Sequence, residues 1–118
     1  MKKYEKYLMN LIKKYQPILL LDKFTFQLEL DDDDDNYFAN SFRYPYLNAV
    51  IYYSKKSFKD WKKNKKDMTN YIIHEMCHSI TDPLYSKSLE RFTSRSEVEN
   101  ERELLTDYIT NIIIKNNL

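Results

Sequence analysis

Residues 67–81 read DMTNYIIHEMCHSIT, and their apolar side chains recur at the spacing of an α-helix. A helix turns by about 100° per residue, so these apolar residues fall on one side of it. Asp67 or Thr69 is suited to cap the start, because a short polar side chain accepts a hydrogen bond from the first turn. Pro83 is expected to end the helix, since proline donates no backbone hydrogen bond. The side predicted to be buried consists of Ile72, Ile73, Met76, Cys77 and Ile80.

The opposite side of this helix carries the only two histidines of the chain, His74 and His78, in an HExxH motif. Residues four apart lie about one turn apart on the same face, so both imidazoles can bind one Zn²⁺ at about 2.0–2.1 Å. Glu75 flanks that face, where its carboxylate can reach a water molecule on the metal. Cys77 lies on the apolar side, which favours a place in the core over a role as a ligand. The pattern therefore predicts a metal site.

A hydrolytic zinc site uses three protein ligands and keeps one position open for water. Asp82 lies eight residues beyond His74. On one helix this separation is about 12 Å along the axis, too far to share a metal ion with His74. The third ligand is therefore expected from another part of the chain.

Residues 95–115 have the periodicity of a second long helix, and this helix offers several glutamates. Glu103 and Asp107 share a strip that could face the motif helix, which favours Glu103 as the third ligand. Glu101 remains a competitor, because it falls within the apolar sector and a buried acid also needs a partner. The apolar side, expected to pack on the core, consists of Leu104, Leu105, Tyr108, Ile109, Ile112 and Ile113.

The rest of the chain mixes helical and strand patterns, which predicts a single α+β domain over residues 1–118. Residues 3–16 have helical spacing that Pro17 stops, and residues 23–30 alternate as in a half-buried strand, with Phe24, Phe26, Leu28 and Leu30 on one face. The further expected segments are strands at 37–44 and 46–54, a short helix or a loop at 55–66, and a polar linker at 84–94.

Composition excludes several classes of protein. The chain has 42% hydrophobic and 31% charged residues and a net charge of +1, so there is no overall electrostatic case for nucleic acid or a membrane as partner. A single cysteine excludes an internal disulfide and fits a reducing compartment. The N-terminus lacks the apolar stretch of a signal peptide, which predicts a cytoplasmic protein. Glycine is absent, so left-handed backbone positions are expected to fall to Asn or Asp.

Two charged segments have alternative interpretations. The acidic run at residues 31–35 could bind a cation, but it lacks the glycine and the closing glutamate of a calcium loop, which favours a solvated turn. The basic segment at residues 55–66 contains Trp61 and could contact nucleic acid, although a solvated lead-in to the next helix is favoured.

The HExxH motif followed by Glu103-Leu104-Leu105-Thr106-Asp107 resembles the motif pair of the gluzincin metallopeptidases. The short chain is similar to the minimal catalytic domains called minigluzincins and to small metallopeptidase-like proteins encoded by phages. This resemblance implies His74, His78 and Glu103 as zinc ligands, Glu75 as general base and Asp107 as an acceptor that orients a ligand histidine. It further implies that the strand at residues 47–54 is the edge strand that binds an extended substrate.

These features predict a zinc-dependent metallopeptidase that acts on a peptide or protein substrate. Zinc would polarise the scissile carbonyl, and Glu75 would take a proton from water and pass it to the leaving amine. Tyr85, Arg91 and Arg95 are the nearby candidates for stabilising an oxyanion. Two alternatives remain open: a zinc-binding regulatory or structural module with little turnover, and a metal-free structural protein.

Overall fold

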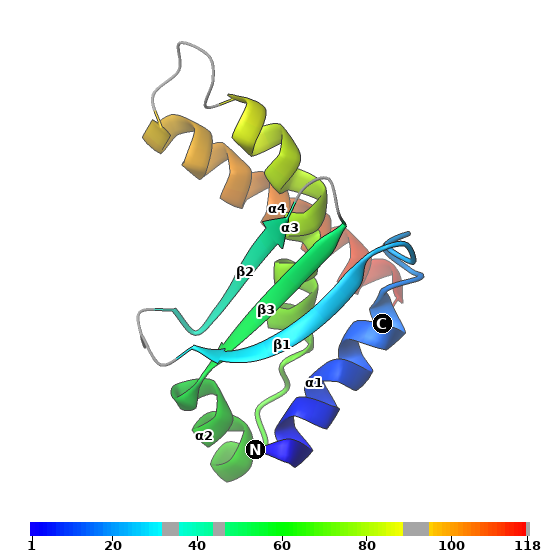
Figure 1. Ribbon diagram of the computed structural model, residues 1–118, viewed down its shortest axis with the longest axis vertical. Helices are drawn as coiled ribbons and strands as arrows, with labels where there is room; N and C mark the ends of the chain where they lie inside the picture. Colours follow the sequence, from blue (N-terminus) through cyan, green and yellow to red (C-terminus); the bar gives the residue numbers. More distant parts are fainter. Residues whose placement is uncertain (32–35, 44–46, 89–94, 118) are drawn as a thin grey trace.

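The computed structural model describes residues 1–31, 36–43, 47–88 and 95–117, and it confirms the α+β class. A small sheet packs against one helix from the N-terminal part of the chain and one from its C-terminal half, and the last helix packs on the latter (Figure 1). None of the helices in the described ranges is both long and apolar enough to cross a membrane. The elements in chain order are α1 (Lys2–Tyr15), β1 (Thr25–Asp31), β2 (Phe38–Arg43), β3 (Asn48–Ser54), α2 (Lys55–Asn64), α3 (Thr69–Ser88) and α4 (Arg95–Asn117).

The three strands pair in the order β1-β3-β2. β3 runs parallel to β1, with Thr25 opposite Asn48, and antiparallel to β2, with Phe38 opposite Tyr53. The expectation that residues 47–54 form an edge strand is therefore wrong: β3 is central and β2 is an edge. The physical reason is that β3 is the segment richest in β-branched and aromatic residues, and such side chains gain most where both neighbours are strands.

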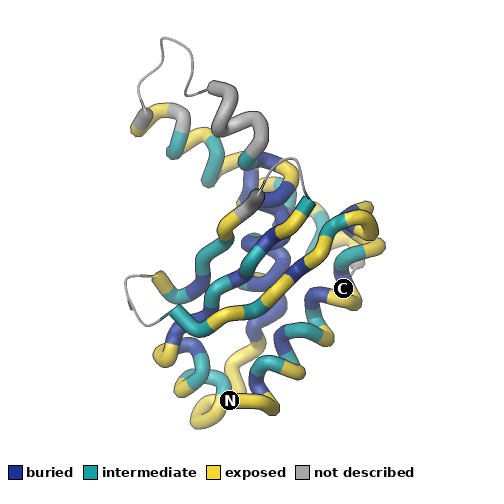
Figure 2. Tube along the Cα trace, in the orientation of Figure 1, coloured by how far each residue is buried: buried dark blue, intermediate teal, exposed yellow. Residues whose placement is uncertain are grey.

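One face of the sheet forms the core with α1 and α3 (Figure 2). Phe26, Ala49, Ile51 and Tyr53 are buried on this face, as the alternation in β1 predicts. The other face of β1 carries Gln27 and Glu29, which are exposed. The helices contribute Tyr4, Leu8, Ile12, Tyr15, Ile72, Ile73, Met76 and Cys77 to the same core.

The start of α3 is capped as expected, and its end is not. The Asp67 carboxylate accepts hydrogen bonds from Thr69 N at 3.0 Å and Thr69 Oγ1 at 2.6 Å, and these bonds lower the pKa of Asp67. The helix then continues through Pro83 to Ser88. Packing against α4 offsets the hydrogen bond that proline cannot donate, and the Thr81 and Thr106 hydroxyls meet across this contact at 3.0 Å.

Two open questions about the backbone are answered. Residues 55–64 form a helix, α2, which begins where Ser54 Oγ accepts a hydrogen bond from Ser57 N at 3.0 Å. Left-handed backbone positions were expected at Asn or Asp. In the described residues they are instead occupied by Leu20, Leu47 and Lys65, with φ of 58°, 55° and 50°. Each such position costs about 1–2 kcal/mol, which the contacts on either side must offset.

The orientation of α4 differs in part from the prediction. The strip with Glu103 and Asp107 does face α3, and it includes Thr106 and Thr110, both of which are buried. The small threonines allow α4 to approach α3 closely along this strip. As a result, only part of the predicted apolar side of α4 packs on the core. Ile109 and Ile113 pack on the core, whereas Leu104, Leu105, Tyr108 and Ile112 are 63%, 41%, 67% and 44% exposed. Ile80, predicted to be buried on α3, is 44% exposed.

Candidate metal centre

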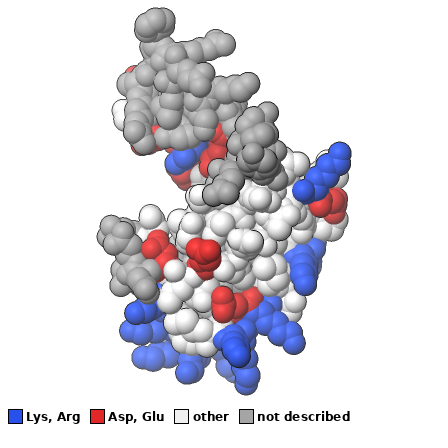
Figure 3. All heavy atoms as spheres, viewed as in Figure 1, with Lys and Arg blue, Asp and Glu red and all other residues white. Residues whose placement is uncertain are grey.

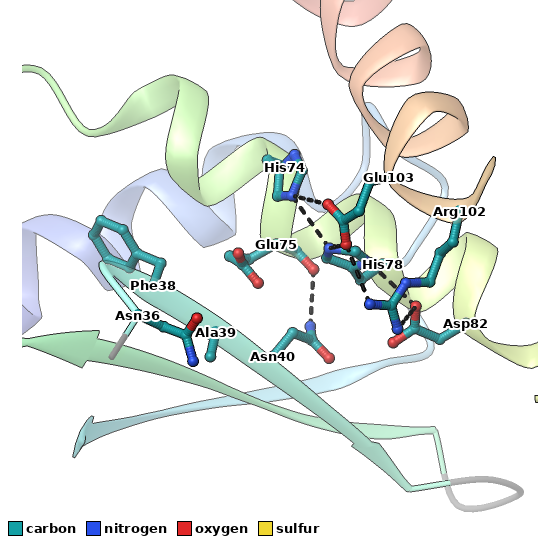
Figure 4. Close-up of a pocket in the computed structure, with 10 residues that line it drawn as sticks. All are labelled: Asn36, Phe38, Ala39, Asn40, His74, Glu75, His78, Asp82, Arg102 and Glu103. Atoms are coloured by element: carbon teal, nitrogen blue, oxygen red, sulfur yellow. Dashed lines mark hydrogen bonds and ion pairs between the residues drawn. The ribbon is translucent and has the colours of Figure 1, made fainter. Parts of the chain in front are cut away.

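The two histidines of α3 and one glutamate of α4 converge on a single point (Figure 4). His74 Nε2 and His78 Nε2 lie 3.2 Å apart. Glu103 reaches both, with Oε2 at 3.3 Å from His74 Nε2 and Oε1 at 3.5 Å from His78 Nε2. The predicted ligand atoms from two helices are thus brought together, and this group could hold a metal ion.

The outer nitrogen of each imidazole faces a carboxylate. His74 Nδ1 lies 2.8 Å from Asp107 Oδ1, and His78 Nδ1 lies 3.1 Å from Asp82 Oδ1. A carboxylate accepts hydrogen bonds, so each ring donates from Nδ1, and in a neutral ring the lone pair is then at Nε2. Both lone pairs point toward Glu103, which is itself an acceptor. Three acceptor groups without a hydrogen between them repel one another, and a cation at their centre removes that repulsion.

His78 is the more enclosed of the two histidines, at 6% exposure. Burial lowers its pKa, but the hydrogen bond to Asp82 and the negative charges of Glu75, Asp82 and Glu103 raise it by more, so the net pKa is raised. The protein therefore surrounds this imidazole with negative charge, which favours a positive charge at the site.

Glu75 is buried beside the histidines, at 7% exposure. Burial in a medium of low polarity raises the pKa of its carboxyl to about 7, and the charges of Glu103 and Asp82 act in the same direction. The Glu75 backbone carbonyl accepts a hydrogen bond from Asn40 Nδ2 at 2.8 Å, which ties α3 to the edge strand β2. A carboxyl group with a pKa near neutrality can both take and return a proton at physiological pH.

A cavity of about 390 Å³ opens in front of these groups, between α3 and β2. Arg102 forms part of its wall, with Nη2 at 3.2 Å from Glu103 Oε1 and Nη1 at 3.9 Å from Asp82 Oδ1. This guanidinium therefore offsets part of the negative charge that the site gathers. The opposite wall consists of Phe38, Ala39 and Asn40 of the edge strand β2, together with Asn36, which precedes this strand.

Not every residue singled out in the sequence belongs to this site. Glu101 is exposed and lies outside the group. Cys77 is fully buried in the core, where burial raises the pKa of its thiol. The side chains of Tyr85, Arg91 and Arg95, and residues 32–35 of the acidic run, lie outside the described residues.

Three residues of the site were missed in the sequence. Asp82 was considered only as a ligand, yet it lies four residues after His78, the spacing that places two side chains on one helical face. That signal could have identified it as the acceptor for His78. Arg102 and Asn40 carry no such local signal, because they reach the site from α4 and β2.

The carboxylates behind the histidines give a direct test of how the site is built. Asp82→Asn and Asp107→Asn are each expected to weaken metal binding about 10- to 100-fold, because an amide orients the imidazole and supports its basicity less well. Competition with a chromogenic chelator measures this affinity. Asp22→Asn, at an exposed carboxylate outside the site, is the matched control. Equal affinities in all three variants would contradict the assignment.

Comparisons of the chain with protein-family models, with curated proteins and with solved structures find no match.

Proposed function

We propose that this protein is a zinc-dependent metallopeptidase. The observation that carries the proposal is the convergence of His74, His78 and Glu103 with the buried carboxyl of Glu75 beside them in one cavity. The motif pair that resembles the gluzincins points in the same direction.

The spacing of the donor atoms supports zinc as the metal. In a tetrahedral site with bonds of about 2.0–2.1 Å, neighbouring donors lie about 3.3–3.4 Å apart. His74 Nε2 and His78 Nε2 are 3.2 Å apart, close to this spacing, and each imidazole has one Glu103 oxygen nearby, Oε2 at 3.3 Å from His74 and Oε1 at 3.5 Å from His78. With one atom from each residue, all three donors lie within 4.8 Å of one another, so a small rotation of the Glu103 carboxylate completes the triangle. Two imidazoles and one carboxylate also match the ligands of many hydrolytic zinc sites, which leave the fourth position to water or substrate.

Glu75 is the residue we assign as general base. Its carboxylate accepts a proton from the attacking water and returns it to the leaving amine. Zinc bound to His74, His78 and Glu103 would lower the pKa of a water molecule and polarise the scissile carbonyl. The hydrogen bond from Asn40 to the Glu75 carbonyl fixes this part of α3 against β2, so the base and the strand keep a constant separation.

The edge strand β2 is the element we assign to substrate binding. It forms a wall of the cavity, and within the described ranges it pairs only with β3, on one side. A peptide in extended form can therefore add to its other side through backbone hydrogen bonds. This role falls to β2 in place of the central strand β3.

Metal removal tests the proposal. Protein purified without chelators is expected to contain about one zinc ion per chain, measured by mass spectrometry, and to hydrolyse casein. A chelator such as 1,10-phenanthroline should stop hydrolysis, and added zinc should restore it. Protein that is folded yet contains no zinc, and binds none when it is added, would refute the proposal.

A zinc-binding module with little turnover is the second candidate. The observation in its favour is the size of the cavity, about 390 Å³, near the lower limit for small-molecule sites. Stoichiometric zinc without hydrolysis of casein or of a peptide library would favour this module over the peptidase.

A further inference from the structure

A second and larger cavity lies at the other end of the fold, between the start of α1 and α2. Its volume is about 970 Å³, and among the described residues the two cavities have no lining residue in common. The proposed peptidase mechanism makes no use of it.

Aromatic rings form the apolar part of this cavity. Tyr7, Phe58 and Trp61 line it and are half-buried. Trp61 lies 5.4 Å from Tyr7 and 6.4 Å from Phe58 between ring centroids. The Tyr7 hydroxyl accepts a hydrogen bond from Met68 N at 3.1 Å and donates one to Asp67 at 3.3 Å. The rings are therefore held in place, so a ligand that contacts them pays little to order them.

Lysines surround these rings. Lys2 and Lys3 come from α1, while Lys62, Lys65 and Lys66 come from α2 and the segment after it. Figure 3 shows the concentration of positive side chains over this end of the molecule. Within the described ranges, no carboxylate lies at ion-pair distance from any of the five.

Two acids close to the lysines, Asp67 and Asp60, are each engaged in a hydrogen bond, and of the five lysines Lys66 is attracted by Asp60. Asp67, which lines the cavity, binds Thr69 at the start of α3. Asp60 accepts a hydrogen bond from the Tyr37 hydroxyl at 2.7 Å. Positive charge is therefore concentrated at this end of a chain whose net charge is only +1. Like charges around an apolar cavity repel one another, and an anionic ligand relieves that repulsion.

We propose that this cavity binds an acidic peptide segment that carries an aromatic or aliphatic side chain. The apolar side chain occupies the space over Tyr7, Phe58 and Trp61, and the carboxylates around it pair with the lysines. Aromatic residues at the centre and charged residues at the rim are the usual anatomy of a protein interface.

The ring geometry favours a peptide over single-stranded nucleic acid. Stacking of successive bases needs open aromatic faces. Here Trp61 packs on Tyr7 and on Tyr4, whose centroid is 5.0 Å away, and Tyr4 stacks on Tyr7 at 6.4 Å. In addition, none of the lining residues in the described part of the chain is arginine, the side chain best suited to bidentate phosphate contacts.

Trp61 is the only tryptophan of the chain, so its fluorescence reports on this cavity directly. The probe is the peptide EDEFEDLEDE, titrated into the full chain at low salt. We expect saturable quenching or a shift of the Trp61 emission, and binding that weakens as salt is added. The neutral peptide QNQFQNLQNQ and the peptide EDESEDSEDE, which lacks the apolar side chains, are both expected to bind more weakly.

The double variant Lys62→Gln/Lys65→Gln is expected to bind the acidic peptide about 5- to 10-fold more weakly. Lys13→Gln/Lys23→Gln, which removes the same charge at exposed positions outside the cavity, is the matched control and is expected to bind normally. Circular dichroism verifies that both variants are folded. Repeating the titration with chelator present separates this site from the metal centre, because its binding does not require a metal ion.

The proposal is overturned if the peptide leaves the Trp61 emission unchanged, or if both double variants lose affinity equally. Tighter binding of oligothymidylate than of the acidic peptide would also overturn it and would identify a nucleic-acid site. None of these outcomes bears on zinc content or peptidase activity.

Discussion

Glu75→Gln is expected to retain zinc and to lose peptidase activity by at least about 100-fold, because a positioned general base contributes roughly 10²- to 10⁴-fold to such reactions. Glutamine keeps the volume and the polar character of the side chain, so the buried wall of the cavity is preserved. It cannot accept a proton from water at neutral pH. Zinc content by mass spectrometry and kcat/KM on an unstructured peptide measure the two effects separately.

The same variant has a second expected effect, on stability without metal. Burial raises the pKa of Glu75 to about 7 in the folded protein, above the value of about 4.3 in an unfolded chain. The folded state therefore holds an extra proton between these pH values, and the free energy of unfolding falls as pH rises through that range. Metal-free Glu75→Gln should avoid this loss and be more stable than metal-free wild type at pH 8, by at most about 3–4 kcal/mol. Denaturant unfolding in the presence of chelator provides the measurement.

Full peptidase activity in a zinc-loaded Glu75→Gln protein would contradict the role assigned to Glu75. Loss of zinc together with activity would show instead that this carboxyl takes part in holding the metal. Glu29→Gln, at an exposed glutamate on β1, is the control and should change neither quantity.

Glu103→Ala is expected to lose zinc almost completely, because the site then keeps only two of its three protein ligands. The fall in affinity should exceed the roughly 10- to 100-fold loss expected when an outer carboxylate is replaced. Glu101→Ala should bind zinc as the wild type does, since Glu101 is exposed and lies outside the converging group. Isothermal titration with zinc compares the two variants under the same conditions.

This pair is closely matched, because both glutamates belong to α4 and lie only two residues apart. A stability change common to helix substitutions would therefore affect both. The reverse result, zinc lost in Glu101→Ala and retained in Glu103→Ala, would show that α4 is rotated about its axis so that Glu101, and not Glu103, faces the histidines.

Most features of α3 could be predicted from the sequence, because the positions of side chains on one helix depend only on their spacing along the chain. The spacing of four residues places His74 and His78 on one face, and the core positions Ile72, Ile73, Met76 and Cys77 follow from the same repeat. Asp82 lies four residues after His78 on the same helix, so the same spacing could have predicted their contact. The predicted end of α3 at Pro83 was wrong, because the contact with α4 stabilises the helix beyond this residue.

The orientation of α4 was harder to predict from its pattern. The apolar repeat pointed to a face with Leu104 and Tyr108, but these side chains are exposed. The helix contacts α3 through Thr106 and Thr110, which a hydrophobicity pattern does not mark as buried. Threonine is small enough to let two helices approach closely, and its hydroxyl can bond within its own helix, as Thr110 Oγ1 does with the Thr106 carbonyl at 2.7 Å.

The α+β class and the face of α3 that carries His74, Glu75 and His78 follow from the amino-acid sequence alone, because both depend on repeats of a few residues. Three features depend on the folded chain: Glu103 meets the histidines, β2 borders the cavity, and lysines of α1 and α2 gather around Trp61. Each of these depends on how a helix is rotated about its axis or on the order of strands in the sheet. Contacts between residues far apart in the chain set both, and no local pattern records them.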